Sequence, residues 1–465
     1  MSSPPPPNDD SDESSSSAEP FDRPRHVRYF AHSLKSLPAA YAHLDTNRLT
    51  LCHFAVHSLD LLGVLDDDDQ LETLGIRKDE IVDWIYSLQK LPSSPSADDE
   101  DDNDDGQNDE PNKNRTSDES QAGGGFKGGG FLGGPGAQYE KMTEDAEPSD
   151  DNGNGNGNGN GNGNGNGSNS CNSCNGCNSC NGCNSKNKVD VDSSDGNCSN
   201  GCNSINNSNS KSKYRCLPYD GFEYDHSHVA MTYTAVCTLA ALGDDLSRFD
   251  RDGAIQSLKK LQLDDGSFQC IHFGSENDMR FLFCACAISY MLNDWSGVDV
   301  DRAVDFIRSC RSYDGAISLL PGQEGHGGST FCAISALTLM GKAEAVLAED
   351  GWRDELIRWC VSRQLGGLQG RPNKVEDTCY SYWIGGTLRL LGCDNLLDTK
   401  ALTHFVLSCQ TDMGGFSKVL GVYPDLLHSF YSMAWLSLSS TQGLNDLHCS
   451  LGMRLDPTNV FEQFK

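Results

Sequence analysis

The stretch Leu261-Gln262-Leu263-Asp264-Asp265-Gly266-Ser267-Phe268 decides the fold, because related phrases recur three more times further along the chain. Each phrase follows an amphipathic stretch and carries a polar anchor before its glycine. The anchors are Gln262, Arg311, Gln364 and Gln410. They lie 49, 53 and 46 residues apart, and such a period indicates a repeated unit, here two helices and a Gly-rich turn. The glycines would supply the positive φ needed just past a helix end.

The segments between these turns are predicted to be helical. In eleven stretches the apolar residues recur at three- and four-residue intervals, and no clear alternating strand pattern appears. We therefore expect an all-α fold. The stretches are Arg48–Leu62, Glu80–Leu91, Met231–Leu242, Arg251–Leu261, Met279–Leu292, Asp301–Cys310, Thr330–Met340, Arg353–Gln364, Cys379–Leu391, Ala401–Cys409 and Leu426–Leu436.

An earlier copy of the repeat ends at Gln89, in Tyr86-Ser87-Leu88-Gln89-Lys90-Leu91-Pro92. Gln89 lies 173 residues before Gln262, and leaving out segments 94–122 and 138–212 shortens this separation to 69 residues. That remainder is close to one repeat with an extra loop, so we interpret the two segments as inserts in a single repeat array. Such an array is either an open solenoid or a closed toroid, and the period alone does not decide between them.

The N-terminal tail, residues 1–20, and both inserts are expected to be disordered, because they contain too few apolar groups to offset chain entropy. The first insert is acidic, with an almost unbroken acidic run at 98–105, and the second is rich in Asn, Gly and Cys. Its cysteines between Cys171 and Cys183 recur every three residues, and C-x-x-C pairs can bind zinc. No apolar residue or histidine accompanies them, which favours repeat expansion, although adventitious metal binding stays open. The expected folded domain spans 21–455.

The bulk composition excludes several classes of protein. A formal net charge of −31 argues against a general nucleic-acid binder, which should be basic. The sequence has no apolar run of eighteen residues, so it predicts no membrane span. The N-terminus lacks the basic and apolar regions of a signal peptide. We therefore expect a cytoplasmic protein whose cysteines are reduced.

A candidate metal site is formed by Val375-Glu376-Asp377-Thr378-Cys379-Tyr380-Ser381-Tyr382-Trp383 and, about fifty residues later, Asp425-Leu426-Leu427-His428-Ser429-Phe430. Asp377, Cys379 and His428 offer oxygen, sulfur and nitrogen. Three protein ligands with an open fourth position are typical of catalytic zinc. A thiol that arrived there would lose its proton to become a nucleophile at neutral pH. On spacing alone this evidence is weak, because a buried Cys is usually just a small core residue.

Cationic and imidazole groups lie near this candidate site in the sequence. Arg371 and Lys374 stand just upstream of it, and His326 belongs to the Gly-rich loop Gly322-Gln323-Glu324-Gly325-His326-Gly327-Gly328. A metal-bound thiolate beside a cationic cluster is suited to displacing an anionic leaving group such as diphosphate.

With these features together, the chain resembles the β subunits of protein prenyltransferases, and among them the geranylgeranyltransferase type I group. The resemblance covers roughly 24–93, 125–136 and 217–440 and breaks at the two inserts. It implies an α/α toroid, a barrel of six inner and six outer helices around an apolar funnel. The phrases that carry it are Gly274–Phe281, Gly325–Cys332, Gly370–Lys374 running into Asp377–Trp383, and Gly414–Lys418.

The resemblance also implies an activity. The enzyme would transfer a geranylgeranyl group from geranylgeranyl diphosphate to the Cys of a C-terminal CaaX box, with X mostly Leu. Its substrates would be proteins such as Rho/Rac-type small GTPases, and it would work as an obligate heterodimer with a prenyltransferase α subunit. One Zn²⁺ per β subunit would be held by Asp377, Cys379 and His428. The diphosphate would be bound by His326, Arg371, Lys374 and Tyr380.

Two cations have further roles by the same resemblance. Arg280 aligns with the residue near the carboxylate at the peptide's C-terminus. Lys418, in Gly414-Gly415-Phe416-Ser417-Lys418, stands where farnesyl-type relatives carry an Asp that helps to bind Mg²⁺. An ammonium beside the diphosphate would replace that ion, so Mg²⁺ is predicted not to be required.

The lipid and peptide pocket is expected to include five aligned positions. Thr50 replaces a large Trp of farnesyl-type relatives and leaves room for a fourth isoprene unit, while Trp383 lines the funnel. Leu427 replaces an aromatic residue and, with Phe54, suits a large apolar X residue. Tyr431 departs from the Phe expected in the geranylgeranyl type, which makes some use of farnesyl diphosphate conceivable.

Two alternatives remain open at this point. The nearer one is the β subunit of a protein farnesyltransferase or of the Rab-specific geranylgeranyltransferase. The other is a non-catalytic helical-repeat scaffold, which predicts no metal, and the Asp–Cys–His set argues against it.

Overall fold

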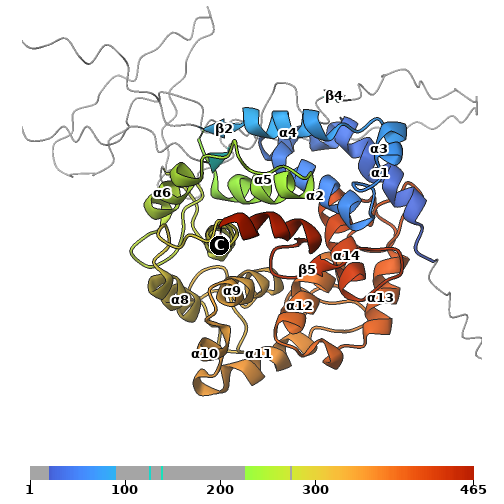
Figure 1. Ribbon diagram of the computed structural model, residues 1–465. Coiled ribbons are helices and arrows are strands. Elements are labelled where there is room, and N and C mark those ends of the chain that lie inside the picture. The colour runs from blue at the N-terminus through green and yellow to red at the C-terminus, as the bar shows by residue number, and fades with distance from the viewer. Residues whose placement is uncertain (1–19, 91–124, 127–137, 140–225, 273–274, 465) are drawn as a thin grey trace, which may run out of the picture. The chain divides into compact units, whose positions relative to one another are not determined.

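The computed structural model describes residues 20–90, 125–126, 138–139, 226–272 and 275–464. The expected disordered tail lies outside these ranges except for Pro20, and so do the two expected inserts except for Gln138–Tyr139. Within the described ranges the secondary structure is almost entirely helical (Figure 1), and none of the helices there has the length and apolar character needed to cross a membrane.

Six helices form an inner ring in which each packs against two neighbours (Figure 1). Because the last of them packs back onto the first, the repeat array closes into a toroid, and the solenoid alternative is wrong. In ring order the helices are α2 (Arg48–Leu61), α5 (Val229–Ala241), α7 (Met279–Met291), α9 (Gly327–Leu339), α12 (Thr378–Leu390) and α14 (Leu426–Leu438).

Six further helices lie outside the ring. Composition separates the two sets: α9 has no charged residue and eleven of its thirteen residues are buried, whereas an outer helix buries one stripe, such as Ala303, Val304, Phe306 and Ile307. The outer helices are α1 (Arg23–Lys35), α4 (Lys78–Ser87), α6 (Arg251–Leu261), α8 (Val300–Ser309), α11 (Trp352–Val361) and α13 (Thr399–Ser408).

Smaller elements complete the described chain. Two short helices are α3 (Asp68–Leu74) and α10 (Ala343–Leu347), and the 3-10 helices are η1 (Ala39–Asn47), η4 (Glu349–Gly351), η5 (Asp394–Leu396) and η6 (Asp456–Phe464). Two-residue strands pair as β1 (Ser36–Leu37) with β4 (Gln138–Tyr139), β2 (Gln89–Lys90) with β3 (Gly125–Phe126), and β5 (Leu447–His448) with β6 (Met453–Arg454). The first residues of the second expected insert are therefore paired with the domain.

The polar anchors of the repeat join consecutive outer helices. Gln262 accepts a hydrogen bond from Asp299 N at 2.7 Å and donates to Asp299 O at 3.0 Å, and Asp299 is the N-cap of α8. Arg311 makes the equivalent connection through an ion pair with Glu355 of α11, at 2.7 Å. The equivalent amide bonds join Gln89 to Asp250, Gln364 to Asp398 and Gln410 to Asp22.

The turn glycines let the next outer helix approach. Gly266 has φ +86°, and a Cβ there would lie 2.0 Å from Arg302 O. A Cβ on Gly414 would lie 2.4 Å from Arg25 O. Since Arg25 belongs to α1, the last repeat uses the first outer helix of the chain as its next helix, which closes the outer layer.

The inner helices begin at one end of the toroid. The first N–H of four of them donates to the loop that precedes the next inner helix: Val229 N to Cys270 O, Met279 N to Leu319 O, Gly327 N to Gly370 O and Thr378 N to Lys418 O. For α14 the ring is completed by Tyr41, whose hydroxyl accepts from Leu426 N at 3.0 Å. Gathered helix N-termini make this end attractive to anions.

The C-terminal segment covers the opposite end. Asn445 N donates to Leu61 O at the end of α2, and Tyr233 donates to Leu451 O at 2.6 Å from inside the ring. The folded domain continues past the expected boundary at 455, because η6 packs on the barrel and Asn293 Nδ2 donates to Phe464 O at 3.0 Å.

Candidate active site

Asp377, Cys379 and His428 converge at the end of the toroid where the inner helices begin. One ligand atom from each lies within 4.8 Å of the other two. His428 Nε2 is 3.3 Å from Asp377 Oδ1. Asp377 and Cys379 are buried and His428 is largely so, with 15 % of its side chain exposed. The structure therefore brings together the three residues that were predicted from separate stretches of sequence.

Helix capping explains this placement. Asp377 is the N-cap of α12, and its Oδ1 accepts from Cys379 N at 3.0 Å, which fixes the carboxylate beside the thiol. Asp425 is the N-cap of α14, and its Oδ1 accepts from His428 N at 2.9 Å. Because α12 and α14 are neighbours in the ring, their first turns face each other across the site.

Asp425 is a further candidate for a functional residue, and no role was predicted for it from the sequence. Its Oδ2 accepts a hydrogen bond from His428 Nδ1 at 2.6 Å, while Oδ1 caps the helix. This bond leaves Nε2 of His428 facing Asp377. The signal was present in the sequence, as an Asp three residues before the His at the start of an apolar helix.

The electrostatics of the three groups decide which protons a metal ion would have to replace. Burial and Asp377 raise the pKa of the Cys379 thiol well above its usual value. Burial lowers the pKa of His428, but hydrogen bonds to Asp377 and Asp425 outweigh it and raise that pKa to about 9. At neutral pH Cys379 therefore keeps its thiol proton and His428 is an imidazolium. Binding of a divalent cation would release one proton from each.

The three residues fit a tetrahedral zinc ion. Zn–ligand distances of 2.0 to 2.3 Å place tetrahedral ligand atoms about 3.3–3.8 Å apart, and the His428–Asp377 separation of 3.3 Å already lies in this range. The donor set of one carboxylate, one thiol and one imidazole leaves a fourth position open. The carboxylate of Asp425 behind His428 is the outer partner that metal-bound imidazoles ordinarily have.

Lys418 lies beside this group. Its Nζ is 3.5 Å from Asp377 Oδ2, and 54 % of its side chain remains exposed. The backbone around it is held by α12, because Thr378 N donates to Lys418 O at 3.0 Å. The ammonium therefore stands at the rim of the site, available to a ligand that enters from solvent.

His326 and Tyr380 form a second polar pair. His326 is the N-cap of α9, and its Nδ1 accepts from Gly328 N at 3.0 Å. The neutral ring therefore carries its proton on Nε2, which lies 2.9 Å from Tyr380 Oη. Burial, with a smaller effect of Arg371, lowers the pKa of His326. Since His326 donates to the tyrosine oxygen, the Tyr380 O–H is free to donate to a ligand.

Arg371 and Lys374 occupy the loop before α12. Arg371 pairs with Glu324 at 2.8 Å and keeps 42 % of its side chain exposed, and Lys374 is exposed. Arg371 acts on His326 electrostatically, which places it with the polar pair. Lys374 is held to this region only by the loop it belongs to.

Arg280 lies in a different polar group, at the start of α7. It pairs with Asp278 at 2.6 Å and Glu276 at 2.9 Å, so two carboxylates already neutralise it. His228, the N-cap of α5, is close enough that Arg280 and, more strongly, burial lower its pKa to about 4. Nδ1 of His228 accepts from Ala230 N at 3.1 Å, so the neutral ring carries its proton on Nε2. Sequence reasoning missed His228 because no motif marks it.

Four of the five predicted pocket residues are linked to the interior. Phe54 packs against Tyr431 at a ring distance of 5.8 Å, and Tyr431 packs against Trp383 at 4.2 Å. Thr50, one turn before Phe54 on α2, contacts Met231 Sδ at 3.5 Å. Leu427 instead has 39 % of its surface exposed, next to His428. Aromatic rings therefore extend from the metal-ligand group into the barrel.

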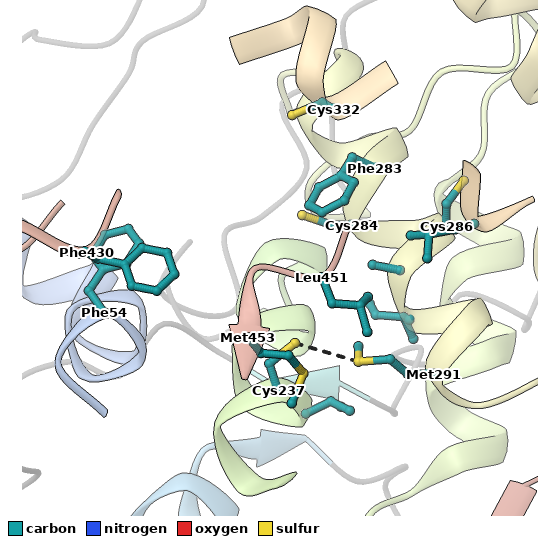
Figure 2. Close-up of a cluster of buried hydrophobic side chains, with 14 of the residues drawn as sticks. Phe54, Cys237, Phe283, Cys284, Cys286, Met291, Cys332, Phe430, Leu451 and Met453 are labelled. Atoms are coloured by element: carbon teal, nitrogen blue, oxygen red, sulfur yellow. Dashed lines mark hydrogen bonds between the residues drawn. The ribbon is translucent and has the colours of Figure 1, made fainter. Parts of the chain in front are cut away.

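Beyond these rings the interior is apolar and rich in sulfur. Phe54 packs against Phe430 with ring centroids 5.3 Å apart, and the sulfurs of Cys237 and Met291 are 3.6 Å apart. Figure 2 shows both pairs. Cys284 and Cys332 are buried on the neighbouring helices α7 and α9. Burial raises the pKa of the Cys332 thiol to about 12, so this thiol is uncharged at neutral pH.

Comparison with known proteins agrees with this geometry. The family model of the prenyltransferase alpha-alpha toroid domain matches residues 21–453. The chain is 35 % identical over 443 residues to the geranylgeranyl transferase type-1 subunit beta of Arabidopsis thaliana, covering 94 % of this chain and 89 % of the relative. It is 30 % identical over 423 residues to the same subunit of Dictyostelium discoideum, covering 90 % and 92 %.

A solved structure shares the fold. The Candida albicans protein geranylgeranyltransferase-I complexed with GGPP superposes with a TM-score of 0.62, covering 96 % of this chain and 99 % of that chain at 18 % identity.

Proposed function

This chain belongs to the prenyltransferase α/α toroid family, and from that premise we propose that it is the catalytic β subunit of a protein geranylgeranyltransferase type I. It would pair with an α subunit and transfer the C20 group of geranylgeranyl diphosphate to the Cys of a C-terminal CaaX box. The observation that carries this proposal is the convergence of Asp377, Cys379 and His428 at the rim of an apolar interior.

A zinc ion fits these three residues, and when bound it would lower the pKa of a substrate thiol in the open position. The chain's own groups arrange the site around it. Asp425 holds His428 so that Nε2 faces the metal position, and the Cys379 backbone orients Asp377. Burial of the ligands excludes competing water.

Departure of diphosphate would be assisted by hydrogen-bond donors and cations near the metal-ligand group. Tyr380 has a free O–H because His326 donates to its oxygen. Arg371 and Lys374 would add charge from the loop before α12, and Lys418 would add it from beside Asp377. Negative charge grows on the leaving oxygen as its bond to C1 breaks, so donors held in place beforehand stabilise the transition state more than the substrate.

Lipid length is proposed to depend on the α2 wall. Thr50 has a small side chain one turn before Phe54, and a Trp at that position would fill the space beside Met231. The peptide's C-terminal carboxylate would be recognised at the start of α7, where Arg280 and His228 are neighbours. The apolar X residue of the CaaX box would lie against Leu427 and Phe54.

The test is co-expression with candidate α subunits, followed by transfer assays that combine C15 or C20 diphosphate with peptides ending in Leu, Met or Ser. We expect the C20 donor and the Leu peptide to give the highest kcat/KM, and the chain alone to be inactive. Cys379→Ala should abolish transfer and metal binding, whereas Cys360→Ala, a buried thiol on α11, should keep both. Preference for the C15 donor and a Met peptide would reassign the chain to the farnesyl type.

A further inference from the structure

The first outer helix reaches the loop that carries Lys418. His26 of α1 is fully buried and stacks on Phe416 with ring centroids 4.5 Å apart. Its Nδ1 accepts a hydrogen bond from Gly415 N at 3.0 Å, and its Nε2 lies 2.8 Å from Gln410 Oε1. A single imidazole thus contacts both the anchor of the last repeat and the loop beyond it.

The surroundings fix the tautomer of this imidazole. Gln410 Oε1 accepts from Asp22 N at 3.0 Å, and its Nε2 donates to Pro20 O at 3.2 Å, so the amide cannot be turned round. His26 Nε2 must therefore carry the proton and donate to Gln410, and Nδ1 must be the bare acceptor for Gly415. Burial, the dominant influence, lowers the pKa of His26 to about 4, in agreement with a neutral ring.

The loop that His26 holds is also bonded to both helices that carry the metal ligands. Phe416 N donates to Ser429 Oγ at 2.8 Å, and Thr378 donates through Oγ1 to Ser417 O at 2.9 Å and through N to Lys418 O at 3.0 Å. Thr378 lies between two of the candidate ligands, and Ser429 directly follows the third. Four consecutive loop residues are therefore held by α1, α14 and α12.

The loop from Gly415 to Lys418 has little room to move between these contacts. Gly415 has φ +73°, and a Cβ there would lie 2.7 Å from Tyr29 Cε1 and 2.8 Å from Ser429 Oγ. The loop is thus confined between α1 and α14. Loss of the bond to His26 should therefore shift the loop backbone as far along as Lys418, because there is no gap that could absorb the change.

We propose that His26 is a positioning residue for the transfer reaction, acting through its Nδ1–Gly415 bond to set Lys418 beside Asp377. This inference rests on the proposed function, in which Lys418 neutralises the departing diphosphate. A residue that served only the fold would act through the other bond, to Gln410, which closes the toroid. The two roles use different nitrogen atoms of one ring and can be separated.

Two substitutions separate them. His26→Asn places an amide oxygen at the position of Nδ1 and keeps the acceptor for Gly415, but it cannot reach Gln410. His26→Gln places an amide nitrogen at the position of Nε2 and keeps the bond to Gln410, but it leaves Gly415 without an acceptor. Arg23→Ala is the matched control, because Arg23 donates to Leu62 O at 3.1 Å and ties α1 to α2 without touching the loop.

The experiment uses the heterodimer with its α subunit and measures the single-turnover rate, the peptide KM and the Tm. His26→Gln should lower the single-turnover rate by about ten- to a hundredfold, as a small misplacement of a catalytic group does, with little change in KM. His26→Asn and Arg23→Ala should lower Tm but keep the wild-type rate. In the cobalt-substituted protein, the visible bands should shift in His26→Gln alone, because Lys418 no longer sits beside Asp377.

A further comparison tests the route through Lys418. Adding Lys418→Ala to His26→Gln should slow transfer much less than it does in the wild type, because the ammonium is already displaced. Full additivity would overturn the inference, as would a wild-type rate in His26→Gln or an equal loss in His26→Gln and His26→Asn that follows Tm. A wild-type heterodimer without transfer activity would refute the proposed function instead, and the cobalt spectra would still decide the positioning role.

Discussion

Replacing Asp425 with Asn should weaken the metal site while leaving its helix intact. Oδ1 of Asp425 caps α14 through His428 N, and Oδ2 accepts from His428 Nδ1 at 2.6 Å. Asn is as good an N-cap as Asp, so the cap survives. The second bond does not, because the amide NH₂ meets the Nδ1–H donor. Turning the amide round would rescue the imidazole only by giving up the cap.

The size of the effect follows from the geometry. Losing the outer partner of a metal-bound imidazole costs about 10- to 100-fold in metal affinity, which corresponds to about 1.4–2.8 kcal/mol. Asp425 keeps 39 % of its side chain exposed, so water offsets part of the lost bond. We therefore expect the lower end of the range, about tenfold.

The assay is zinc affinity of the purified heterodimer, measured by competition with a chromophoric chelator, together with Tm. Asp398→Asn is the matched control, since Asp398 caps the outer helix α13 through Ala401 N at 3.0 Å and lies outside the site. The control should keep wild-type zinc affinity. Unchanged zinc affinity in Asp425→Asn would refute the orienting role of this carboxylate, and an equal loss in both variants would show that helix capping alone is measured.

Three more outcomes are expected. Zinc affinity should fall steeply as pH drops below 9, by up to about a hundredfold per pH unit, because binding must displace one proton from Cys379 and one from His428; a flat profile in the chelator assay would contradict this. Lys418→Asp should slow single-turnover transfer without added metal and regain part of the rate in millimolar Mg²⁺, whereas the wild-type rate should not depend on Mg²⁺; a many-fold Mg²⁺ stimulation of the wild type would argue for the farnesyl type. Deleting 98–119 and 140–210 should leave kcat/KM and zinc content largely unchanged, since long loops cost little closure entropy; a large loss would give the inserts a part in the active complex.

Local patterns in the sequence were sufficient for most of the fold. Each of the eleven predicted stretches overlaps an observed helix. Among the six inner and six outer helices, only α1 was not predicted. Its Val27, Phe30, Ala31 and Leu34 follow helical spacing, but they stand among Arg, His and Lys residues that mask the apolar stripe. The period also located the anchors, although Arg311 shows that an ion pair can replace the amide.

Contacts between residues far apart in the chain could not be predicted from the spacing of the repeats. Nothing in the period shows that Gln410 meets Asp22, because the bond joins the two ends of the repeat array. The metal ligands could be proposed because their chemistry is distinctive. His228 and His26 could not, since a buried imidazole looks like any other His until its partner is known, and Asp425 was marked only by its place three residues before His428.

The repeat array can close into a ring only late in the synthesis of the chain. Asp22 and Gln410 are 388 residues apart, so at about 5–20 residues per second the ribosome needs roughly 20–80 s to deliver the partner of the first helix. Throughout that interval the apolar stripe of α1 has no last repeat to pack against, and the two long inserts extend the wait. The bond that closes the toroid can therefore form only after residue 410 has been made, and every earlier stage of synthesis contains an open repeat array.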